Sequence, residues 1–501
     1  MKKTNSQNKF PNKSKPKIVL PNCSLKSPTN QKNFAVPKIV DFSNQIKYIS
    51  TDSQPKRKVL FPSLPLLVKT KIDAVNDLFS KKCSLCFQKC DFSDSKGTQF
   101  IIAKEDILRE ILQYCKEGKF ESKTIEIIYK SVFSLIAVHI FRIPKDLPNL
   151  WKSVYDIYFQ NDEYRISEWI HLSNVYDIGM AFINRDDFIL ETAGEYATDM
   201  FKLLVYLSRT MDEREQKKIA EMILCLYKKL GIFRSFSLRV IASALNRVVF
   251  DNDPFTSPKP LLVALTSIAA GFSVPLKPHF AMLYLNAVLP LHKSQYMEYF
   301  CDELLVCSTQ FLEKDGKLVV PTFEYLVRVW PRLQPRKQIR FINTIALFAS
   351  FVEENNLTLC FRIVFPQLSK SLLGCHQEIS LRVLSMWEIS DFVWFVTEKP
   401  EDTYPIILPV LFEAAKSHWD AEVREMSLNV LYVMQQNNSE LFEAVGKGLK
   451  QMQSFTLIQG MKKGSIWMYL VDNYEKSVVK KTMKIERIAV LFPGCEAMVE
   501  K

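Results

Sequence analysis

The chain is poor in glycine. Only 13 of its 501 residues are Gly, well below the usual share of roughly 7%, and no Gly-Gly or Asn-Gly dipeptide occurs. Such dipeptides favour the tight turns of β-hairpins. Their absence argues against a sheet protein and favours an all-helical fold.

Motifs of enzyme active sites are also absent. No phosphate-binding Gly-rich loop, nucleophile elbow or dinucleotide fingerprint occurs. Cys375 and His376 are adjacent, which on a helix directs their side chains about 100° apart. The histidines form no H-E-x-x-H or H-x-x-x-H pair; they are His139, His171, His279, His292, His376 and His418. The sequence therefore predicts a protein that is not an enzyme and holds no cofactor.

A metal site is not expected either. Cys83-x-x-Cys86-x-x-x-Cys90 superficially resembles a zinc knuckle, but the next candidate ligand is Cys115, across a predicted helix. We expect these residues to be buried small hydrophobes. The eleven cysteines are scattered behind a polar, lysine-rich N-terminus, a pattern typical of a reducing intracellular compartment.

The chain lacks a hydrophobic run of about 18 residues, so we expect no membrane association. Its formal charge of +12 is unevenly distributed, since residues 1–60 hold 13 Lys and Arg residues against only Asp41 and Asp52. The remainder is nearly neutral. Because binding to nucleic acid phosphates requires clustered cations on the folded surface, we expect no nucleic acid partner.

Residues 1–60 are predicted to be a disordered basic tail. They contain six of the 24 prolines and many Lys, Asn and Ser residues, a composition that buries too little apolar surface to fold. Lys56, Arg57 and Lys58 have the form of a nuclear-import signal. The alternative is a solvated charge run. The expected location is the cytoplasm, with the nucleus as a second location if the signal acts.

From about residue 70 the apolar residues repeat at helical spacing. One face runs through Ile219, Met222, Ile223, Leu226, Tyr227 and Leu230. Proline-containing breaks, such as 331–335 and 399–405, separate helical units of some tens of residues. The pattern predicts a HEAT-like α-solenoid of antiparallel helix pairs over residues 61–450, followed by a C-terminal helical extension over 451–501.

Several strings, read in order, resemble the regulatory B-prime subunits of protein phosphatase 2A, the fifty-six-kilodalton class. The resemblance covers about residues 60–440. The strings are Ile140-Phe141-Arg142, Gly271-Phe272 with Pro275-Leu276-Lys277, Leu289-Pro290-Leu291-His292-Lys293, Gln310–Asp315 with Trp330-Pro331, Phe341-Ile342-Asn343, and Lys416-Ser417-His418-Trp419.

The resemblance implies a pseudo-HEAT regulatory subunit that binds a phosphatase scaffold subunit and a catalytic subunit. It also implies recruitment of substrate proteins through short L-x-x-I-x-E motifs. The family's motif-binding groove maps onto Tyr227, Arg234, Ile268, Lys277 and His279, with the spacing from Lys277 to His279 one residue shorter than in the family.

The same groove is expected to be altered. Leu224 and Cys225 replace the family's His-Arg pair, and Val263 replaces its glutamate. We interpret the loss of both charges at Cys225 and Val263 as exchange for an apolar contact, because an unpaired buried charge is costly. The alternative function is a HEAT-like scaffold or transport adaptor unrelated to phosphatase, which would have the same fold.

Overall fold

The computed structural model describes residues 62, 64–90, 92, 98–121, 124–142, 165–251 and 258–449. The basic tail, the predicted import signal at Lys56, Arg57 and Lys58, and the extension over 451–501 lie outside these residues and stay predictions. Every regular element in the described part of the chain is a helix. The predicted all-α solenoid is confirmed.

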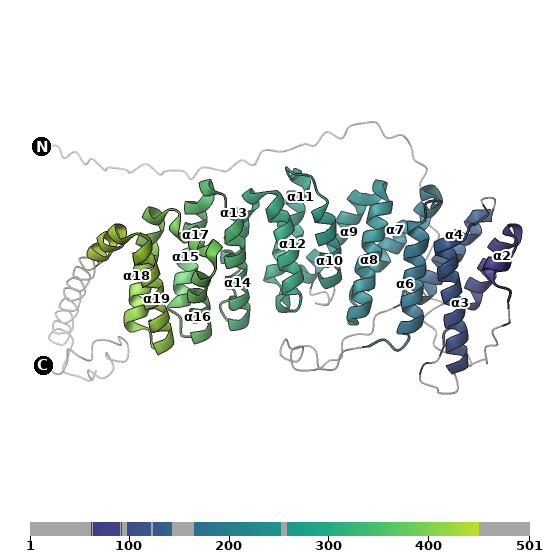
Figure 1. The fold of residues 1–501 in the computed structure, drawn as a ribbon, viewed down its shortest axis with the longest axis horizontal. Helices are drawn as coiled ribbons and strands as arrows, with labels where there is room; N and C mark the ends of the chain where they lie inside the picture. Colours follow the sequence, from purple (N-terminus) through teal and green to yellow (C-terminus); the bar gives the residue numbers. More distant parts are fainter. Residues whose placement is uncertain are drawn as a thin grey trace, which may run out of the picture. The chain divides into compact units, whose positions relative to one another are not determined.

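The helices alternate between two layers, and within each layer a helix contacts the one before it and the one after it. Figure 1 shows them side by side in chain order. The first layer holds α3 (Thr98–Glu117), α6 (Trp169–Asn184), α8 (Glu213–Lys229), α10 (Pro258–Ala270), α12 (Cys301–Lys314), α14 (Pro335–Phe348), α16 (Gln377–Ser385) and α19 (Ala421–Asn437).

The second layer contains the partner of each of these helices. It holds α2 (Ile72–Leu85), α4 (Ile125–His139), α7 (Leu190–Leu207), α9 (Arg234–Phe250), α11 (Pro278–Leu283) with η6 (Tyr284–Val288) and η7 (Leu289–Lys293), α13 (Val319–Arg328), α15 (Leu357–Leu372) and α18 (Pro400–Ser417). The short helix α17 (Ser390–Thr397) precedes α18 in the chain and contacts both α14 and α18.

Short helical turns connect these elements, and residues 439–449 form a further helix after α19. The turns are η1 (Leu67–Lys69), η5 (Gly231–Phe233), η8 (Met297–Phe300), η9 (Gly316–Leu318), η10 (Ala349–Phe351), η11 (Glu354–Asn356) and η12 (Met386–Glu388).

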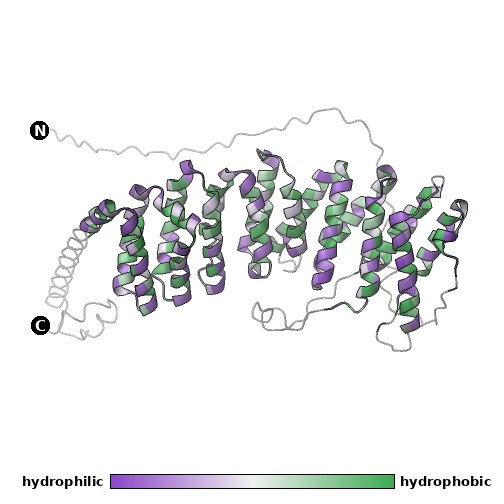
Figure 2. Ribbon diagram, in the orientation of Figure 1, coloured by the Kyte–Doolittle hydropathy of each residue, from purple (hydrophilic) through white to green (hydrophobic). Residues whose placement is uncertain are grey.

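Each helix buries one apolar face between the layers. On α8 the residues spaced as predicted, Ile219, Met222, Ile223 and Leu226, are all buried, which is the periodicity of an amphipathic helix. Figure 2 shows hydrophobic and hydrophilic residues alternating along the helices. The buried side chains of both layers form one continuous core.

Polar contacts between neighbouring units show the length of the repeat. The Lys259 ammonium donates to Glu213, 46 positions earlier, and the Lys229 ammonium donates to the carbonyl of Arg185, 44 positions earlier. The amide of Gln377 reaches Glu422, 45 positions later. An offset of this size matches a HEAT-type repeat.

One predicted break is misplaced. The sequence predicts an interruption over 399–405, but α18 begins at Pro400 and contains Pro405 and Pro409 in its interior. Proline removes a backbone donor and normally disrupts a helix. Here packing offsets that cost, since Tyr404 and Leu408 are fully buried and the Tyr404 hydroxyl donates to the carbonyl of Met434 at 2.9 Å.

Two of the three cysteines of the apparent zinc knuckle are buried as predicted. Cys83, Cys86 and Cys115 are fully buried and Cys90 is half-buried. Burial raises the pKa of the Cys86 and Cys115 thiols to about 12. A thiol held in its neutral form is a poor nucleophile.

None of the helices in the described ranges is both long enough and apolar enough to cross a membrane.

Candidate functional site

The site lies where α8, α9, α10, α11 and η6 meet. These elements surround an open pocket of about 930 Å³, a size typical of ligand-binding pockets. We call it the groove. It has apolar side chains on its floor and basic side chains around its mouth.

The turn between α8 and α9 forms one wall. Helix α8 ends at Lys229, Gly231 opens the short turn η5, and α9 starts at Arg234. Tyr227 at the end of α8 and Arg234 at the start of α9 therefore face each other, and the guanidinium carbon lies 5.6 Å from the centre of the tyrosine ring. This is a cation–π geometry.

Tyr227 is half-buried in this wall. Burial raises the pKa of its phenol, an effect that the nearby positive charge of Arg234 opposes. The hydroxyl therefore stays protonated at neutral pH, and the ring presents an uncharged face to the groove.

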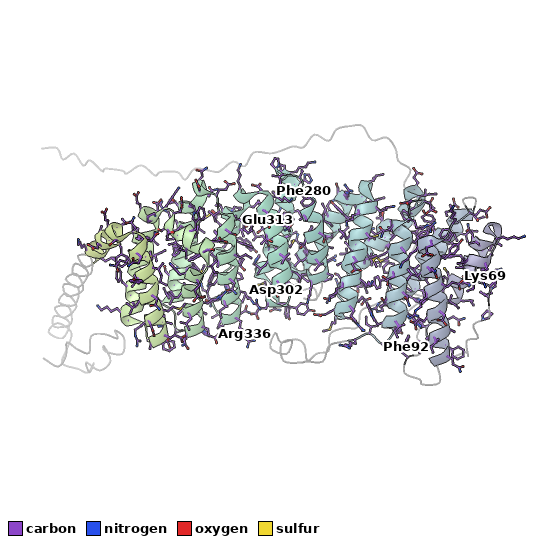
Figure 3. All side chains as sticks on the ribbon, in the orientation of Figure 1. Lys69, Phe92, Phe280, Asp302, Glu313 and Arg336 are labelled. Carbon is purple, nitrogen blue, oxygen red and sulfur yellow. The ribbon has the colours of Figure 1, made fainter. Side chains whose placement is uncertain are left out.

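The opposite wall comes from α10 and α11. Ile268 is 4% exposed and its neighbour Phe272 stacks on Phe280, with ring centres 3.8 Å apart and planes inclined by 10°. Phe280 lies at the α11 end of the groove and is labelled in Figure 3. Lys277 precedes the first turn of α11, and Pro278 fixes the backbone at the first helical position.

All five residues of the predicted groove line this one pocket: Tyr227, Arg234, Ile268, Lys277 and His279. The shortened spacing does not remove His279 from the site, because its ring lies 4.0 Å from that of Phe280 and the residue is exposed at the mouth. The structure brings the predicted residues together. Their role in binding a motif stays a prediction.

Cys225 and Val263 lie outside the groove. Neither residue lines the pocket, whereas Leu224 does. Cys225 is buried and its thiol donates to the side-chain oxygen of Asn184 at 3.2 Å, and burial raises its pKa to about 11. Val263 is 44% exposed. Adjacent positions on a helix point in different directions, so Leu224 faces the groove while Cys225 faces α6.

Sequence reasoning missed several lining residues. Lys228 and Arg239 add positive charge, Phe280 adds an aromatic wall, and Asn246 and Asn286 line the far end. The helical period gave a usable signal for Asn246, because counting in steps of four from Arg234 reaches it.

The groove is electropositive. Four lining side chains are cationic, namely Lys228, Arg234, Arg239 and Lys277, and none of the described lining residues is acidic. Arg234 and Lys277 form no ion pair with a described carboxylate, and both are exposed. The arrangement favours a ligand with an anionic group beside apolar side chains.

The described residues contain no group of three or more His, Cys, Asp or Glu side chains placed to hold a metal ion. The lining side chains offer a ligand apolar contact, positive charge and hydrogen bonds.

Sequence comparisons place this chain among phosphatase subunits. The profile of the protein phosphatase 2A regulatory B subunits, the B56 family, matches residues 64–473. The chain belongs to the B56 family. The match includes the groove and nearly all of the described solenoid.

Individual relatives agree with the family match. A mouse protein, the 56 kDa regulatory subunit alpha isoform of serine/threonine-protein phosphatase 2A, is 25% identical over 434 residues, covering 86% of this chain and 87% of its own. The B' theta regulatory subunit of Arabidopsis thaliana is 27% identical over 79% of this chain and 81% of its own. A solved engineered protein matches 75% of this chain and 97% of its own, with a TM-score of 0.29 and 12% sequence identity.

Proposed function

We propose that this chain is a regulatory subunit of a protein phosphatase 2A-type serine/threonine phosphatase, binding its scaffold and catalytic subunits and selecting its substrates. The observation that carries this proposal is the B56 family match over residues 64–473. Catalysis then belongs to the partner subunit, and this chain is not itself an enzyme. The relatives from mouse and Arabidopsis are named as regulatory subunits, which supports that division of roles.

Co-elution tests the assembly. The full-length chain is mixed with phosphatase scaffold and catalytic subunits at micromolar concentration and passed over a size-exclusion column. We expect a ternary complex. Separate elution of the three proteins would contradict the proposal and would favour the alternative, a HEAT-like scaffold or transport adaptor.

The groove is proposed to recruit substrates. Buried Ile268 and the stacked pair Phe272 and Phe280 offer an apolar wall, and exposed Arg234 and Lys277 offer positive charge at the rim of the groove. A short segment with aliphatic anchors and nearby acidic residues complements both features. The L-x-x-I-x-E motif that the family resemblance implies has this chemistry.

Binding is expected to be weaker than in typical relatives. Leu224 lines the groove at a position where the family resemblance implies a polar residue, and an apolar wall cannot satisfy a buried phosphate. This chain should therefore prefer an apolar residue where relatives favour an acidic or phosphorylated one near the leucine. Isothermal titration with an L-x-x-I-x-E peptide and its phosphorylated form tests this preference. Tighter binding of the phosphorylated form would contradict it.

The location is also a proposal: the chain acts in the cytoplasm and reaches the nucleus through Lys56, Arg57 and Lys58. Three adjacent cations suit an acidic receptor groove. Changing all three to alanine should shift a fluorescent fusion toward the cytoplasm. An unchanged distribution would leave the run as a solvated charge cluster.

A further inference from the structure

The turns of the solenoid lie on two edges. Because the paired helices are antiparallel, turns from the first layer to the second lie on one edge, and turns from the second layer to the first lie on the other. The groove opens beside turns of the first kind, α8–α9 and α10–α11. Figure 3 shows Phe280 of the groove and Arg336, at the start of α14, on opposite edges. We call the edge with the turns from the second layer to the first the return edge.

Large apolar side chains protrude at several turns of the return edge. The exposed fractions are 65% for Phe250 at the end of α9, 94% for Leu333 between α13 and α14, 39% for Leu373 after α15 and 60% for Trp419 between α18 and α19. A single exposed apolar residue is ordinary, but a row of them on one edge marks an interaction surface. At about 8–10 Å between neighbouring helices of a layer, the row extends over roughly 30–40 Å.

The α13–α14 turn is held in a fixed conformation. The Trp330 indole nitrogen donates to the side-chain oxygen of Gln338 at 3.3 Å, and the Gln338 amide donates to the carbonyl of Arg332 at 3.0 Å. Pro335 fixes the backbone at the start of α14. Leu333 therefore protrudes from a rigid turn, and a partner can bind it without first ordering the loop.

Cations accompany these apolar residues on the second-layer side of the return edge. Arg328, Lys370 and Lys416 lie in the last turns of α13, α15 and α18, and these last turns contain no carboxylate. Arg332 directly precedes Leu333. All four cationic residues are exposed and form no ion pair with a described carboxylate, so their charge is available to a partner.

Carboxylates of the return edge lie on its first-layer side. Asp302, Glu378 and Glu422 are in the first turns of α12, α16 and α19. Two of them have partners, because Asp302 lies 3.7 Å from Arg340 and Glu422 accepts a hydrogen bond from Gln377. The second-layer side is complementary to a surface that offers carboxylates beside apolar sockets.

The position of the groove indicates which subunit offers that surface. A substrate held in the groove has to reach the active site, so the catalytic subunit is expected on the groove side of the solenoid. The return edge is then left for the scaffold subunit. A row of anchors along several repeats also requires a partner that extends along the solenoid.

We propose that the return edge docks the phosphatase scaffold subunit, with Leu333 as the central apolar anchor and Arg328 and Arg332 beside carboxylates of the scaffold. Substrate recruitment and assembly then use opposite edges of the same solenoid. This inference rests on the proposed function, in which the chain is a regulatory subunit of the phosphatase.

The test uses the full-length chain with purified scaffold and catalytic subunits. Leu333→Asp and Arg332→Glu change the return edge. Ile232→Asp is the matched control, since Ile232 is an 87% exposed aliphatic residue in the η5 turn on the groove edge. Exposed positions of this kind tolerate substitution, and the thermal midpoint of each variant checks that it is folded.

We expect Leu333→Asp to weaken binding to the scaffold subunit about tenfold or more, the effect of removing an interface anchor. Arg332→Glu should weaken it about threefold to tenfold, and added salt should reduce the difference. Ile232→Asp should bind as the wild type does. Photoreactive p-benzoylphenylalanine in place of Leu333 should crosslink to the scaffold subunit in the ternary complex, and in place of Ile232 it should not.

Wild-type affinity for the scaffold subunit in both Leu333→Asp and Arg332→Glu would overturn the proposal and leave the regulatory role intact. Crosslinking from position 333 to the catalytic subunit alone would also overturn it, and this readout does not depend on the folding of the charge variants. Cosedimentation with phosphatidylserine vesicles that Leu333→Asp abolishes would assign the edge to a membrane instead. A wild-type chain that binds neither subunit would reject the proposed function itself, and the docking edge with it.

Discussion

Two regions of the solenoid hold basic side chains in opposite ways. In the N-terminal repeats they are buried and satisfied by the protein itself: Lys104 is 1% exposed and its ammonium donates to the carbonyl of Gln88 at 2.6 Å. At the groove, Arg234 and Lys277 are exposed and pair with no described carboxylate. Cations that the chain already satisfies stabilise the fold, and cations that only solvent satisfies are available to a ligand.

Breaking a buried pair should have the largest effect. Arg142 donates to Glu215 at 2.6 Å, and the Glu215 side chain is fully buried. Arg142→Met leaves that carboxylate without its cation, so we expect a loss of about 3–5 kcal/mol in the free energy of unfolding. Urea denaturation followed by circular dichroism measures it.

An exposed pair provides the matched control. Lys447 and Glu443 lie 3.4 Å apart with side chains 76% and 60% exposed, so Lys447→Met should change stability by about 0.5 kcal/mol at most. Equal changes for Arg142→Met and Lys447→Met would show that burial does not separate the two classes of cation.

Reversing charges at the groove should affect binding and leave folding intact. Arg234→Glu and Lys277→Glu should each weaken binding of an L-x-x-I-x-E peptide by about 1.5–3 kcal/mol, because each removes a charge-assisted contact. Lys370→Glu, at an exposed position of α15 outside the groove, controls for the change in net charge. Isothermal titration gives the affinities. Equal affinity in all four proteins would show that Arg234 and Lys277 do not contribute to peptide binding, and so contradict the proposed role of the groove in substrate selection.

A buried histidine should make the N-terminal repeats sensitive to acid. Both ring nitrogens of His139 are buried. Burial, together with the charges of Lys104 and His171, lowers its pKa to about 3, and a hydrogen bond with the Cys86 backbone opposes this shift. The unfolded chain binds a proton below about pH 6.5 and the folded chain does not. Stability is therefore unaffected by this group above pH 6.5 and falls below it, by about 2 kcal/mol at pH 5.

The thermal midpoint measured at pH 7 and pH 5 tests this dependence. The drop should be smaller in His139→Leu, which cannot titrate, than in the wild type. Cys90→Ala changes the same small cavity without removing the imidazole and should keep the full drop. An identical drop in all three proteins would show that other groups cause it.

The fold could be predicted from the sequence wherever the buried residues follow the regular period of a helix. The buried face of α8 matched the predicted residues because burial and helical spacing agree there. The predicted interruption over 399–405 was wrong because the packing of α18 overrides the local effect of Pro405. The repeat length was hidden because the contacts that show it, such as Lys259 with Glu213, join polar residues that carry no apolar signature.

The groove could be predicted from the sequence only in part. Tyr227, Arg234, Ile268, Lys277 and His279 were named from a family resemblance and all line one pocket. Spacing alone could not show which of Leu224 and Cys225 faces inward, since that depends on the rotation of α8 against α6. Asn286 reaches the far end of the groove from a π-helical turn at Tyr284–Val288, and no residue type there predicts an irregular turn.

The smallest expected effect concerns how Tyr227 orients Arg234. The arginine lies 5.6 Å from the ring centre and forms no ion pair with a described residue, so the aromatic face helps to hold it at the rim. Tyr227→Phe keeps that face and should bind the L-x-x-I-x-E peptide as the wild type does. Tyr227→Leu removes it and should weaken binding by about 0.5–1 kcal/mol, the usual contribution of an exposed cation–π contact. In the Arg234→Glu background Tyr227→Leu should add little, because no cation remains to be oriented. Titration of the wild type, Tyr227→Phe, Tyr227→Leu, Arg234→Glu and the double variant separates the two contributions. A full additional loss of affinity from Tyr227→Leu in that background would mean that the ring contacts the peptide directly. Tyr227 would then not be needed to orient Arg234.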